Sequence, residues 1–339
     1  MKKVSIAIHH QAGSFSDKWI EYCQKNDIPY KLVNCYASTI IDDIEDCDIL
    51  LWHWHHNDAK AILFARQLLY SIELMGKKVF PDSHTVWHFD DKIGQKYLLE
   101  AIKAPMVKSY VFYEKKEALL WVKETEYPKV FKLRGGAGSA NVKLIKNKNE
   151  AIRYINKAFG KGFATNRLQA YKERVWKFKR DKTLSSFIDI SKGIGRIFIP
   201  NKKLSNLPIE KGYIYAQDFI ADNDSDIRVI VIGSRAFAIK RMVRENDFRA
   251  SGSGKIFYEP SSIPKKCIQI AFETSKKIKS QCTAYDFVFL DGKPLIIEIS
   301  YGFDQKGYLK CPGYWDENLN WISGKFIPEY FIIEDLLSI

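Results

Sequence analysis

The sequence lacks the features that would indicate a membrane, disordered or cysteine-ligated metal protein. No apolar run approaches the roughly 20 residues of a membrane-spanning helix. The six cysteines are scattered, and none of them forms a C-x-x-C pair or another metal-ligand spacing. No low-complexity tract is present, and an aromatic content of 14% excludes a disordered chain. We therefore expect a packed cytoplasmic protein with reduced thiols and no membrane span.

Several common signatures of nucleotide binding and catalysis are missing as well. The stretch GSGK at 252–255 lacks the upstream glycine of a Walker A loop. The stretch GAG at 136–138 continues without the third glycine of a dinucleotide fingerprint. No Ser/His/Asp or Cys/His arrangement indicates a nucleophilic side chain.

What the sequence has in excess is positive charge. Lys and Arg total 53 against 40 Asp and Glu, which gives the 339-residue chain a net charge of +13. Residues 91–182 alone carry 23 Lys and Arg against nine Asp and Glu. They include the cluster Lys172–Lys182, which is typical of a solvated helix or a mobile basic loop. The excess favours an anionic partner, but no nucleic-acid recognition module is present, and we expect no nucleic-acid partner.

Strand and helix patterns alternate in the first 90 residues and then change in character. Early strands are predicted at 4–8, 30–33, 48–54 and 77–80, and helices at 14–25 and after Asn57, the expected cap. This alternation predicts a small parallel sheet with helices on both faces. A helix is expected at 91–103, and later strands at 107–112, 129–133, 142–145, 227–232, 235–243, 285–290 and 294–300.

Two acidic residues, Asp286 and Glu298, lie on the two strands of the last predicted hairpin. A three-residue connection at 291–293 places them directly opposite each other, with Cβ atoms roughly 5 Å apart. Two such carboxylates favour a cation between them, and Mg²⁺ prefers oxygen ligands of this kind. A two-residue turn shifts the register by one residue and separates the two acids onto different faces. The strand arithmetic leaves both possibilities open.

A lysine and a glycine-rich turn lie together further upstream. Lys132 ends a predicted strand just before the turn at 134–139. Backbone N–H groups in such a turn can bind an anion, and a nearby lysine supplies charge. A flexible surface hairpin explains the same pattern at least as well.

All seven histidines lie within the first 88 residues, and most follow a predicted strand. His10 follows the first strand, and His53 and His55 follow the third. Since parallel strands end at one edge of a sheet, these side chains are candidates for a substrate pocket. A zinc site at His53 and His55 and simple hydrogen-bonded histidines are the alternatives. Tyr301 begins an aromatic stretch that either caps a substrate or packs the C-terminal segment onto the core.

The ordered motifs resemble the ATP-grasp superfamily over most of the chain. They are Asp91-Lys92, Lys132 with the glycine turn, Gln217-Asp218-Phe219-Ile220, Asp226-Ile227-Arg228-Val229, Asp247-Phe248-Arg249, Asp286 and Ile297-Glu298-Ile299-Ser300. The nearest parallels are the glutamate ligases that tail a ribosomal protein, with D-alanine–D-alanine ligase and glutathione synthetase more distant. The resemblance implies an α/β (α+β) ATP-grasp fold, in which a small parallel α/β domain precedes two α+β subdomains that clamp ATP. The implied divisions are 1–90, 91–215 and 216–339.

The resemblance also implies roles for individual residues. Phosphates would be bound by Lys92, Lys132, Arg249 and the turn containing Gly135, Gly136 and Ser139. The hinge residues Gln217, Asp218, Phe219 and Ile220 would read adenine, and Asp226 would accept from the ribose hydroxyls. Asp286, Glu298 and Ser300 would hold Mg²⁺, although the family usually has Asn at the position of Ser300. In the catalytic step, Lys132, Arg249 and Arg241 would stabilise charge on the transferring phosphoryl group, and Arg228 is a further candidate for this role and for binding the substrate.

The implied activity is an ATP- and Mg²⁺-dependent carboxylate–amine ligase that acts through an acyl phosphate. Its substrates would be a small carboxylate and an amine, anionic or sugar-linked, with a cell-surface glycan or peptide precursor as one class. The alternatives are a small-molecule kinase of the same fold and a nucleotide-binding regulator without turnover. The basic segment 91–182 would then serve ATP, and a homodimer is left open.

Overall fold

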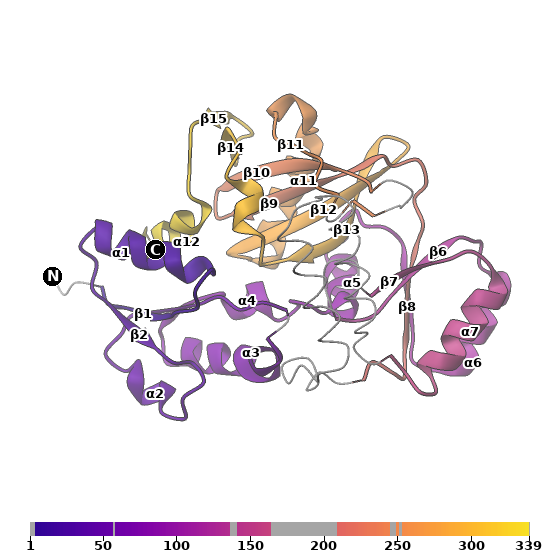
Figure 1. Cartoon of the computed structure of the whole chain (residues 1–339), viewed down its shortest axis with the longest axis horizontal. Coiled ribbons are helices and arrows are strands. Elements are labelled where there is room, and N and C mark those ends of the chain that lie inside the picture. Colours follow the sequence, from indigo (N-terminus) through magenta and orange to yellow (C-terminus); the bar gives the residue numbers. More distant parts are fainter. Residues whose placement is uncertain are drawn as a thin grey trace, which may run out of the picture.

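The computed structural model describes residues 4–56, 58–135, 141–163, 209–244, 249–250 and 253–338. Gly136, Ser139 and the Lys172–Lys182 cluster lie outside these residues, so the expectations about them stay predictions. The described part of the chain contains three sheets, and each forms the centre of one lobe (Figure 1). No helix in these residues is long and apolar enough to cross a membrane.

The first sheet is parallel, with the strand order β2-β1-β3-β4, as the early alternation predicts. Its elements are β1 (Ile6–His9), α1 (Phe15–Lys25), β2 (Tyr30–Val33), α2 (Ile40–Asp43), β3 (Ile49–Trp52), α3 (Ala59–Leu74), β4 (Lys78–Phe80) and α4 (Ser83–Val86). All four residues of β3 are buried, as in a central strand covered on both faces. The expected cap at Asn57 is wrong by one residue, because the Asp58 carboxylate accepts from the N–H groups of Lys60 and Ala61.

The second sheet is small and antiparallel, with the order β5-β8-β6-β7. It consists of β5 (Ser109–Phe112), β6 (Lys129–Lys132), β7 (Val142–Ile145) and β8 (Ile214–Asp218). The helices α6 (Lys115–Glu124) and α7 (Lys148–Ala158) pack on one face, where Phe131 is buried. Side chains alternate along β6, so Val130 and Lys132 point to the opposite face and line a pocket there.

The third sheet is the largest and has the order β13-β12-β9-β10-β14-β15, with β11 beside β10. Its strands are β9 (Ser225–Ile232), β10 (Arg235–Met242), β11 (Ile256–Phe257), β12 (Cys282–Leu290), β13 (Lys293–Ser300), β14 (Gly313–Asp316) and β15 (Trp321–Ser323). The other elements of this part of the chain are α5 (Lys92–Ala101), η1 (Pro260–Ser262), α11 (Lys265–Ile278), η2 (Gln305–Tyr308) and α12 (Pro328–Ser338). Helix α11 covers one face through apolar residues such as Ile268 and Ala271.

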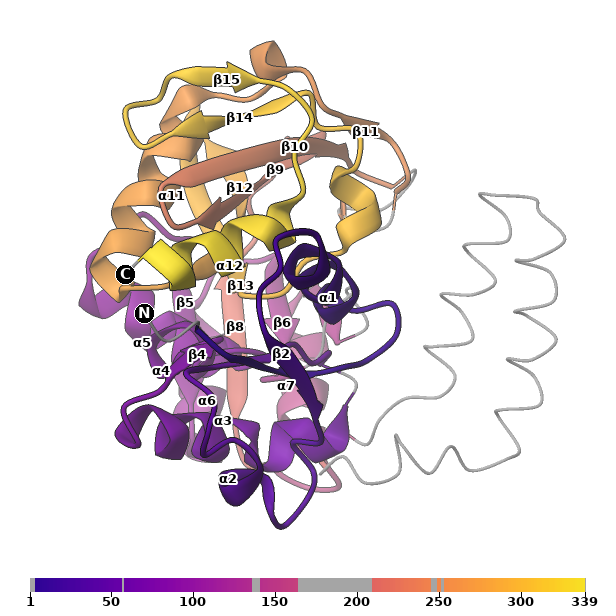
Figure 2. The ribbon, with the colours of Figure 1, turned by 90° about the vertical axis from the view of Figure 1, so that its left-hand side faces the viewer.

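The opposite face of the large sheet packs against the first lobe. One continuous core joins Ile230 and Phe237 of the large sheet, Ile332 of α12 and Trp19 of α1. Figure 2 shows α12 and α1 lying between the large sheet and the first sheet. Apolar packing therefore holds the first 90 residues firmly against the large sheet.

The hairpin of β12 and β13 combines both registers considered from the sequence. The turn contains two residues, Asp291 and Gly292, both with positive φ, so the expectation of a three-residue connection is wrong. A β-bulge then inserts Ile297 as an extra residue on β13, and the register shifts back by one. Asp286 consequently pairs with Glu298, as the acid-pair hypothesis requires.

Candidate active site

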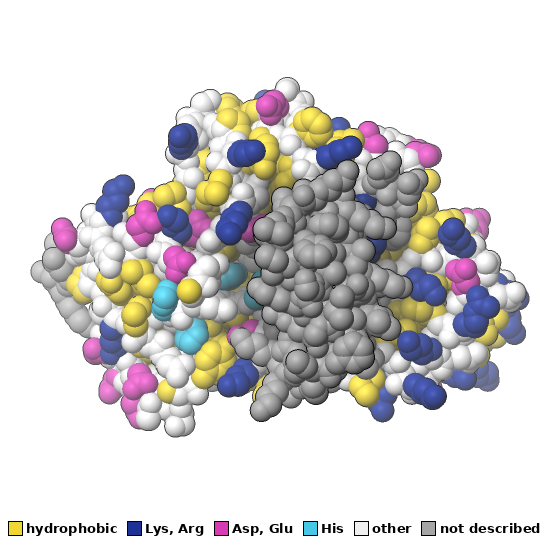
Figure 3. All heavy atoms as spheres, in the orientation of Figure 1, with side chains coloured by type: hydrophobic (Ala, Val, Ile, Leu, Met, Phe, Trp, Pro, Cys, Tyr) yellow, Lys and Arg dark blue, Asp and Glu magenta, His cyan; other side chains and the backbone are white. Residues whose placement is uncertain are grey.

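A pocket of about 340 Å³ lies where the three sheets meet. One side, which we call the charged wall, contains Lys92, Lys132, Asp226, Arg228, Arg241, Asp286 and Glu298. The other side, the histidine wall, contains His53, Trp54, His55, His56, Phe303 and Asp304. Figure 3 shows Lys and Arg side chains gathered on the lobe that carries α6 and α7, whereas the visible histidines lie on the N-terminal side.

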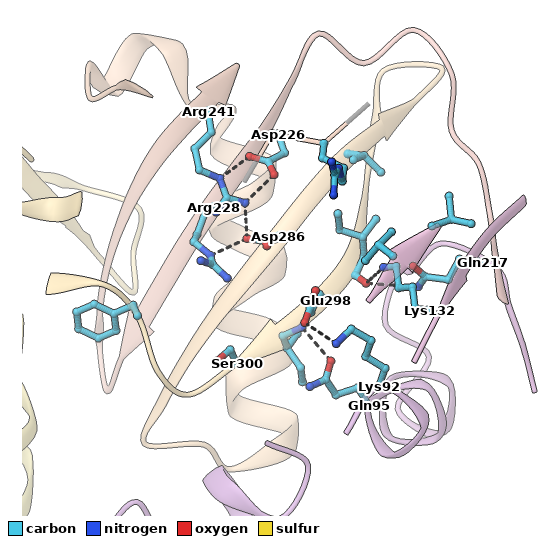
Figure 4. Close-up of a pocket in the computed structure, with 18 of the residues that line it drawn as sticks. Lys92, Gln95, Lys132, Gln217, Asp226, Arg228, Arg241, Asp286, Glu298 and Ser300 are labelled. Carbon is cyan, nitrogen blue, oxygen red and sulfur yellow. Dashed lines mark hydrogen bonds and ion pairs between the residues drawn. The ribbon is translucent and has the colours of Figure 1, made fainter. Parts of the chain in front are cut away.

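Lys92 opens helix α5 and points at one of the two acids (Figure 4). The Asp91 carboxylate accepts from the N–H groups of Ile93 and Gly94, which fixes the start of the helix. Lys92 Nζ lies 3.3 Å from Glu298 Oε1, and Lys92 is 4% exposed. Helix capping and an ion pair together hold this cation beside Glu298 of β13.

The bulge residue Ile297 connects β13 to the small sheet. Its carbonyl oxygen accepts from Lys132 Nζ at 3.5 Å and from Gln217 Nε2 at 3.4 Å. Gln217 also donates to Ser109 Oγ at 3.0 Å. Burial lowers the pKa of Lys132 to about 8, so much of its charge is lost in mildly alkaline solution. The bulge thus places Lys132 and Gln217 of the small sheet next to Glu298 of the large sheet.

Four side chains form a connected ion-pair network on β9, β10 and β12, of which Asp226, Arg241 and Asp286 are buried and Arg228 is half-buried (Figure 4). Arg241 donates from Nε and Nη2 to the two oxygens of Asp226 at 2.7 and 2.6 Å. The same Nη2 lies 3.0 Å from Asp286 Oδ1, and Arg228 Nε lies 2.7 Å from that oxygen. Burial opposes ionisation of Asp286, but Arg228 and Arg241 outweigh it and lower the pKa of this carboxyl.

This network changes the expectation for Asp226. Both of its carboxylate oxygens are engaged by Arg241, and the residue is 6% exposed. An oxygen that binds ribose hydroxyls must be available to them, so the structure favours Asp226 as an anchor for Arg241. Asp222 lies four residues before Asp226 and also lines the pocket, close in sequence to the predicted hinge. Its carboxylate is the better candidate for a ribose contact.

The four residues predicted to form the hinge lie at the pocket, and so does one predicted phosphate ligand. Gln217, Asp218, Phe219 and Ile220 line the pocket, and so does Arg249. Asp218 is paired with Lys129, with 2.6 Å between Oδ1 and Nζ. This pair joins the start of β6 to the end of β8.

The histidines of this wall follow β3, and burial keeps His53 and His56 neutral near pH 7. Burial lowers the pKa of His53 to about 3, with a smaller contribution from His55, and also lowers the pKa of His56 to about 3. His53 stacks on Phe15 with ring centroids 3.8 Å apart, and its Nδ1 lies 2.8 Å from Ser14 Oγ. Ser14 makes no cap bond to α1 and uses its hydroxyl on this imidazole instead.

Two predicted substrate residues do not line the pocket. His10 is exposed, and its Nε2 contacts Asp17 of α1 at 3.0 Å. Tyr301 is fully buried; its hydroxyl accepts from Trp54 N–H at 3.1 Å and donates to the Trp54 carbonyl at 2.9 Å. Tyr301 therefore fixes the histidine wall to the end of β13 and does not contact a substrate.

Other predicted residues are near the pocket or outside the described part. Gly135 does not line the pocket and lies against Asp90, which a Cβ at this position would approach to 3.1 Å. Gln95 was missed by sequence reasoning, although it lies one helical turn after Lys92; its Oε1 accepts from Ile299 N–H at 3.3 Å. The possible zinc site at His53 and His55 finds no support, because no cluster of three metal-ligating side chains occurs in the described ranges.

The donor set near Asp286 and Glu298 fits Mg²⁺ held jointly with phosphates. The two carboxylates face each other across β12 and β13, and no third acidic or histidine ligand joins them among the residues described. Mg²⁺ commonly uses one or two carboxylates together with phosphate oxygens and water. Ser300 Oγ donates to the Gly302 carbonyl at 3.1 Å and accepts from its N–H at 3.2 Å, so its hydroxyl already has backbone partners.

Comparisons with known proteins agree with this architecture. Residues 189–311 match the family model described as a RimK-like ATP-grasp domain. D-alanine–D-alanine ligase from Bacillus anthracis, solved with ATP, is 12% identical and has a TM-score of 0.56 over 100% of this chain and 98% of its own. A RimK-domain ATP-grasp protein from Sphaerobacter thermophilus is 13% identical, with a TM-score of 0.55 over 99% of this chain and 100% of its own.

D-cycloserine synthetase is also similar, with 13% identity and a TM-score of 0.57 over 98% of this chain and 99% of its own. No curated protein matches the sequence significantly. The chain has the ATP-grasp fold, and the resemblance carried by its motifs is confirmed. Identities this low establish the fold alone.

Proposed function

We propose that the protein is an ATP- and Mg²⁺-dependent carboxylate–amine ligase. The observation that carries the proposal is the charged wall, where two facing carboxylates, Asp286 and Glu298, lie among buried cations in an ATP-grasp pocket. Such a wall suits a metal-bound triphosphate, whose charge needs both cations and a divalent metal. In the proposed division into domains, residues 91–215 and 216–339 clamp ATP between them. Residues 1–90 contribute the histidines that would face the acceptor substrate.

The proposed reaction has two steps and needs no nucleophilic side chain. A substrate carboxylate attacks the γ-phosphorus of ATP, which forms an acyl phosphate and releases ADP. An amine then attacks the acyl carbon and displaces inorganic phosphate as an amide forms. Positioning and electrostatic stabilisation lower the barrier to phosphoryl transfer.

The residues of the charged wall have distinct proposed roles. Lys92, Lys132 and Arg249 bind the phosphates, and the hinge from Gln217 to Ile220 binds adenine. Asp286 and Glu298 hold Mg²⁺, which when bound neutralises charge on the transferring phosphoryl group. Arg228 and Arg241 add positive charge where negative charge develops.

The histidine wall is the proposed acceptor side. Neutral imidazoles, an aromatic surface from Trp54 and Phe303, and the Asp304 carboxylate line it. These groups suit a polar amine acceptor, with sugar-linked or peptide precursors as the first class to screen.

The experiment that tests the proposal is an ADP-release screen. Small carboxylates, including uronic acids and peptides, are crossed with amino acids and amines, and products are identified by mass spectrometry. An amide product supports the ligase, whereas a stable phosphorylated product identifies a kinase. Glu298→Gln is the matched negative control, since its side chain has the same size without the charge.

One observation favours a second candidate, a nucleotide-binding regulator. Ser300 stands where the family usually has Asn, and its hydroxyl is already bonded to Gly302 on both sides. ATP binding without ADP release across the whole screen would support the regulator and contradict the ligase.

A further inference from the structure

Both acids of the proposed metal site are already paired with cations in the structure. Asp286 Oδ1 contacts Arg228 Nε at 2.7 Å and Arg241 Nη2 at 3.0 Å. Glu298 Oε1 contacts Lys92 Nζ at 3.3 Å. Lys92, Arg241 and Asp286 are each less than 10% exposed, so water screens these contacts weakly. A divalent cation that approaches these acids competes with charges that belong to the protein.

The two arginines are held in different ways. Arg241 has Asp226 as a second partner, through a pair of parallel hydrogen bonds. Arg228 lies at ion-pair distance from Asp286, but its buried Nε makes no directed hydrogen bond in the described part of the chain. Arg241 is therefore anchored by a second carboxylate, whereas Asp286 is the one acid within ion-pair distance of Arg228 among the described residues.

The charge balance of this wall favours metal and nucleotide together over metal alone. Four cations, Lys92, Lys132, Arg228 and Arg241, stand beside three carboxylates, Asp226, Asp286 and Glu298. Mg²⁺ alone would take Asp286 from Arg228 and Glu298 from Lys92, and the loss of a carboxylate contact is unfavourable for a cation that water screens weakly. The oxygens of a triphosphate can accept hydrogen bonds from both the arginine and the lysine, and they also complete the ligands of the metal.

Resting on the proposed ATP site, we propose that Arg228 and Lys92 are built-in counterions that keep the divalent metal out until nucleotide arrives. Binding then exchanges partners: the two cations move from the carboxylates to the phosphates, and Asp286 and Glu298 turn to the metal. Arg241 stays in place, because Asp226 retains it. Arg228 is in this sense a positioning residue that makes metal binding depend on nucleotide.

The test measures metal affinity directly, with Mn²⁺ as the probe and water-proton relaxation as the readout. Titrations are run with the full chain, without and with saturating ADP, and corrected for metal bound by free ADP. In the wild type, ADP should tighten Mn²⁺ binding at least about tenfold, the effect of roughly 1.4 kcal/mol. Arg228→Gln should tighten binding of Mn²⁺ without nucleotide by about tenfold, because the competing charge is gone.

Two further variants serve as controls. Arg228→Lys keeps the positive charge and should bind nucleotide-free Mn²⁺ as the wild type does. Arg235→Gln removes an equally charged, partly buried arginine whose partners, Glu334 and Asp335, lie in α12. It should also leave nucleotide-free Mn²⁺ affinity unchanged. Thermal melts establish that each variant is folded.

The outcomes separate the two proposals, since no turnover is needed. If ADP fails to tighten Mn²⁺ binding in the wild type and ADP itself does not bind, the proposed ATP site is wrong. If ADP binds but the wild type holds Mn²⁺ equally well without it, the exchange is overturned and the ATP site stands. Unchanged nucleotide-free affinity in Arg228→Gln overturns the exchange as well.

Discussion

The two walls of the pocket differ in the charge state of their polar side chains. On the charged wall, Asp286 keeps its charge because Arg228 and Arg241 lie within 3.0 Å of it. On the histidine wall, His53 stacks on Phe15, and burial lowers the pKa of His53 and of His56 to about 3. Burial therefore preserves ions where counterions are present and produces neutral groups where they are not.

Because of this difference, the two sides of the pocket suit different ligands. The charged wall can bind a polyanion and a metal, because its cations and carboxylates can exchange partners with them. The histidine wall carries neutral imidazoles, ring faces and one carboxylate, Asp304, which suit uncharged or amine groups.

Removal of one carboxylate from the charged wall should abolish turnover. We expect Glu298→Gln to lower ADP release about a thousandfold or more, because the metal loses one of its two charged ligands. The fold should survive, since the amide can still accept from Lys92. A coupled ADP assay and a thermal melt measure the two quantities, and turnover near the wild-type rate would show that Glu298 does not hold the metal.

Breaking the anchor of the charged wall should affect stability more than nucleotide binding. Asp226→Asn leaves Arg241 buried with one fewer counterion, and we expect a loss of about 3 kcal/mol in the free energy of unfolding. Denaturant melts measure this loss. An unchanged stability combined with a raised KM for ATP would instead support ribose binding by Asp226.

A change on the histidine wall should affect the acceptor and spare ATP. We expect His53→Ala or His55→Ala to raise the acceptor KM about tenfold, which corresponds to one or two lost hydrogen bonds. The KM for ATP should stay within experimental error. His10→Ala is the matched control, because His10 lies on the outside of α1 and should leave both constants unchanged.

The charged wall should lose affinity for ATP in alkaline solution. The pKa of Lys132 is lowered to about 8, so its positive charge is present below pH 8 and is lost above it. We expect kcat/KM for ATP to fall roughly fivefold between pH 7 and pH 9. Lys132→Arg does not deprotonate in this range and should flatten this part of the profile. A profile with the same inflection in Lys132→Arg would assign it to another group.

The smallest expected effect concerns the support behind His53. Ser14 Oγ lies 2.8 Å from His53 Nδ1 and makes no cap bond to α1, so its hydroxyl serves to orient the ring. We expect Ser14→Ala to raise the acceptor KM about threefold with kcat unchanged, and Ser14→Thr to restore it. Equal loss in both variants would indicate a packing effect at this position.

The hairpin that carries the acids shows how far sequence reasoning could reach. Asp291-Gly292 is a strong signal for a two-residue turn, and the two-residue register alone would separate Asp286 from Glu298. Only the bulge at Ile297 brings them together, and the sequence Pro294–Ser300 contains no glycine or other signal for it. The three-residue connection expected from the sequence pairs the same two acids, but for the wrong reason, because the pairing comes from a two-residue turn combined with a bulge.

Residue type also misled where the partner was distant in sequence. Asp226 has the expected position for a ribose contact, but Arg241 on the neighbouring strand occupies both of its oxygens. His10 and Tyr301 stood at the expected strand ends, yet one faces solvent and the other bonds to Trp54 in the core. Gln95 carried no motif at all, and only the packing of α5 against β13 brought it to the pocket.

The amino-acid sequence was enough to predict the parallel N-terminal sheet, the strands that follow it, and the residue types of an ATP-grasp pocket. These follow from local periodicity and from motif order, which depend on near neighbours in the chain. The tertiary structure decided which charges are paired, which histidines lose their protons, and in which register the two acids meet. Those properties depend on burial and on partners that are remote in the chain, and local pattern contains no information about either.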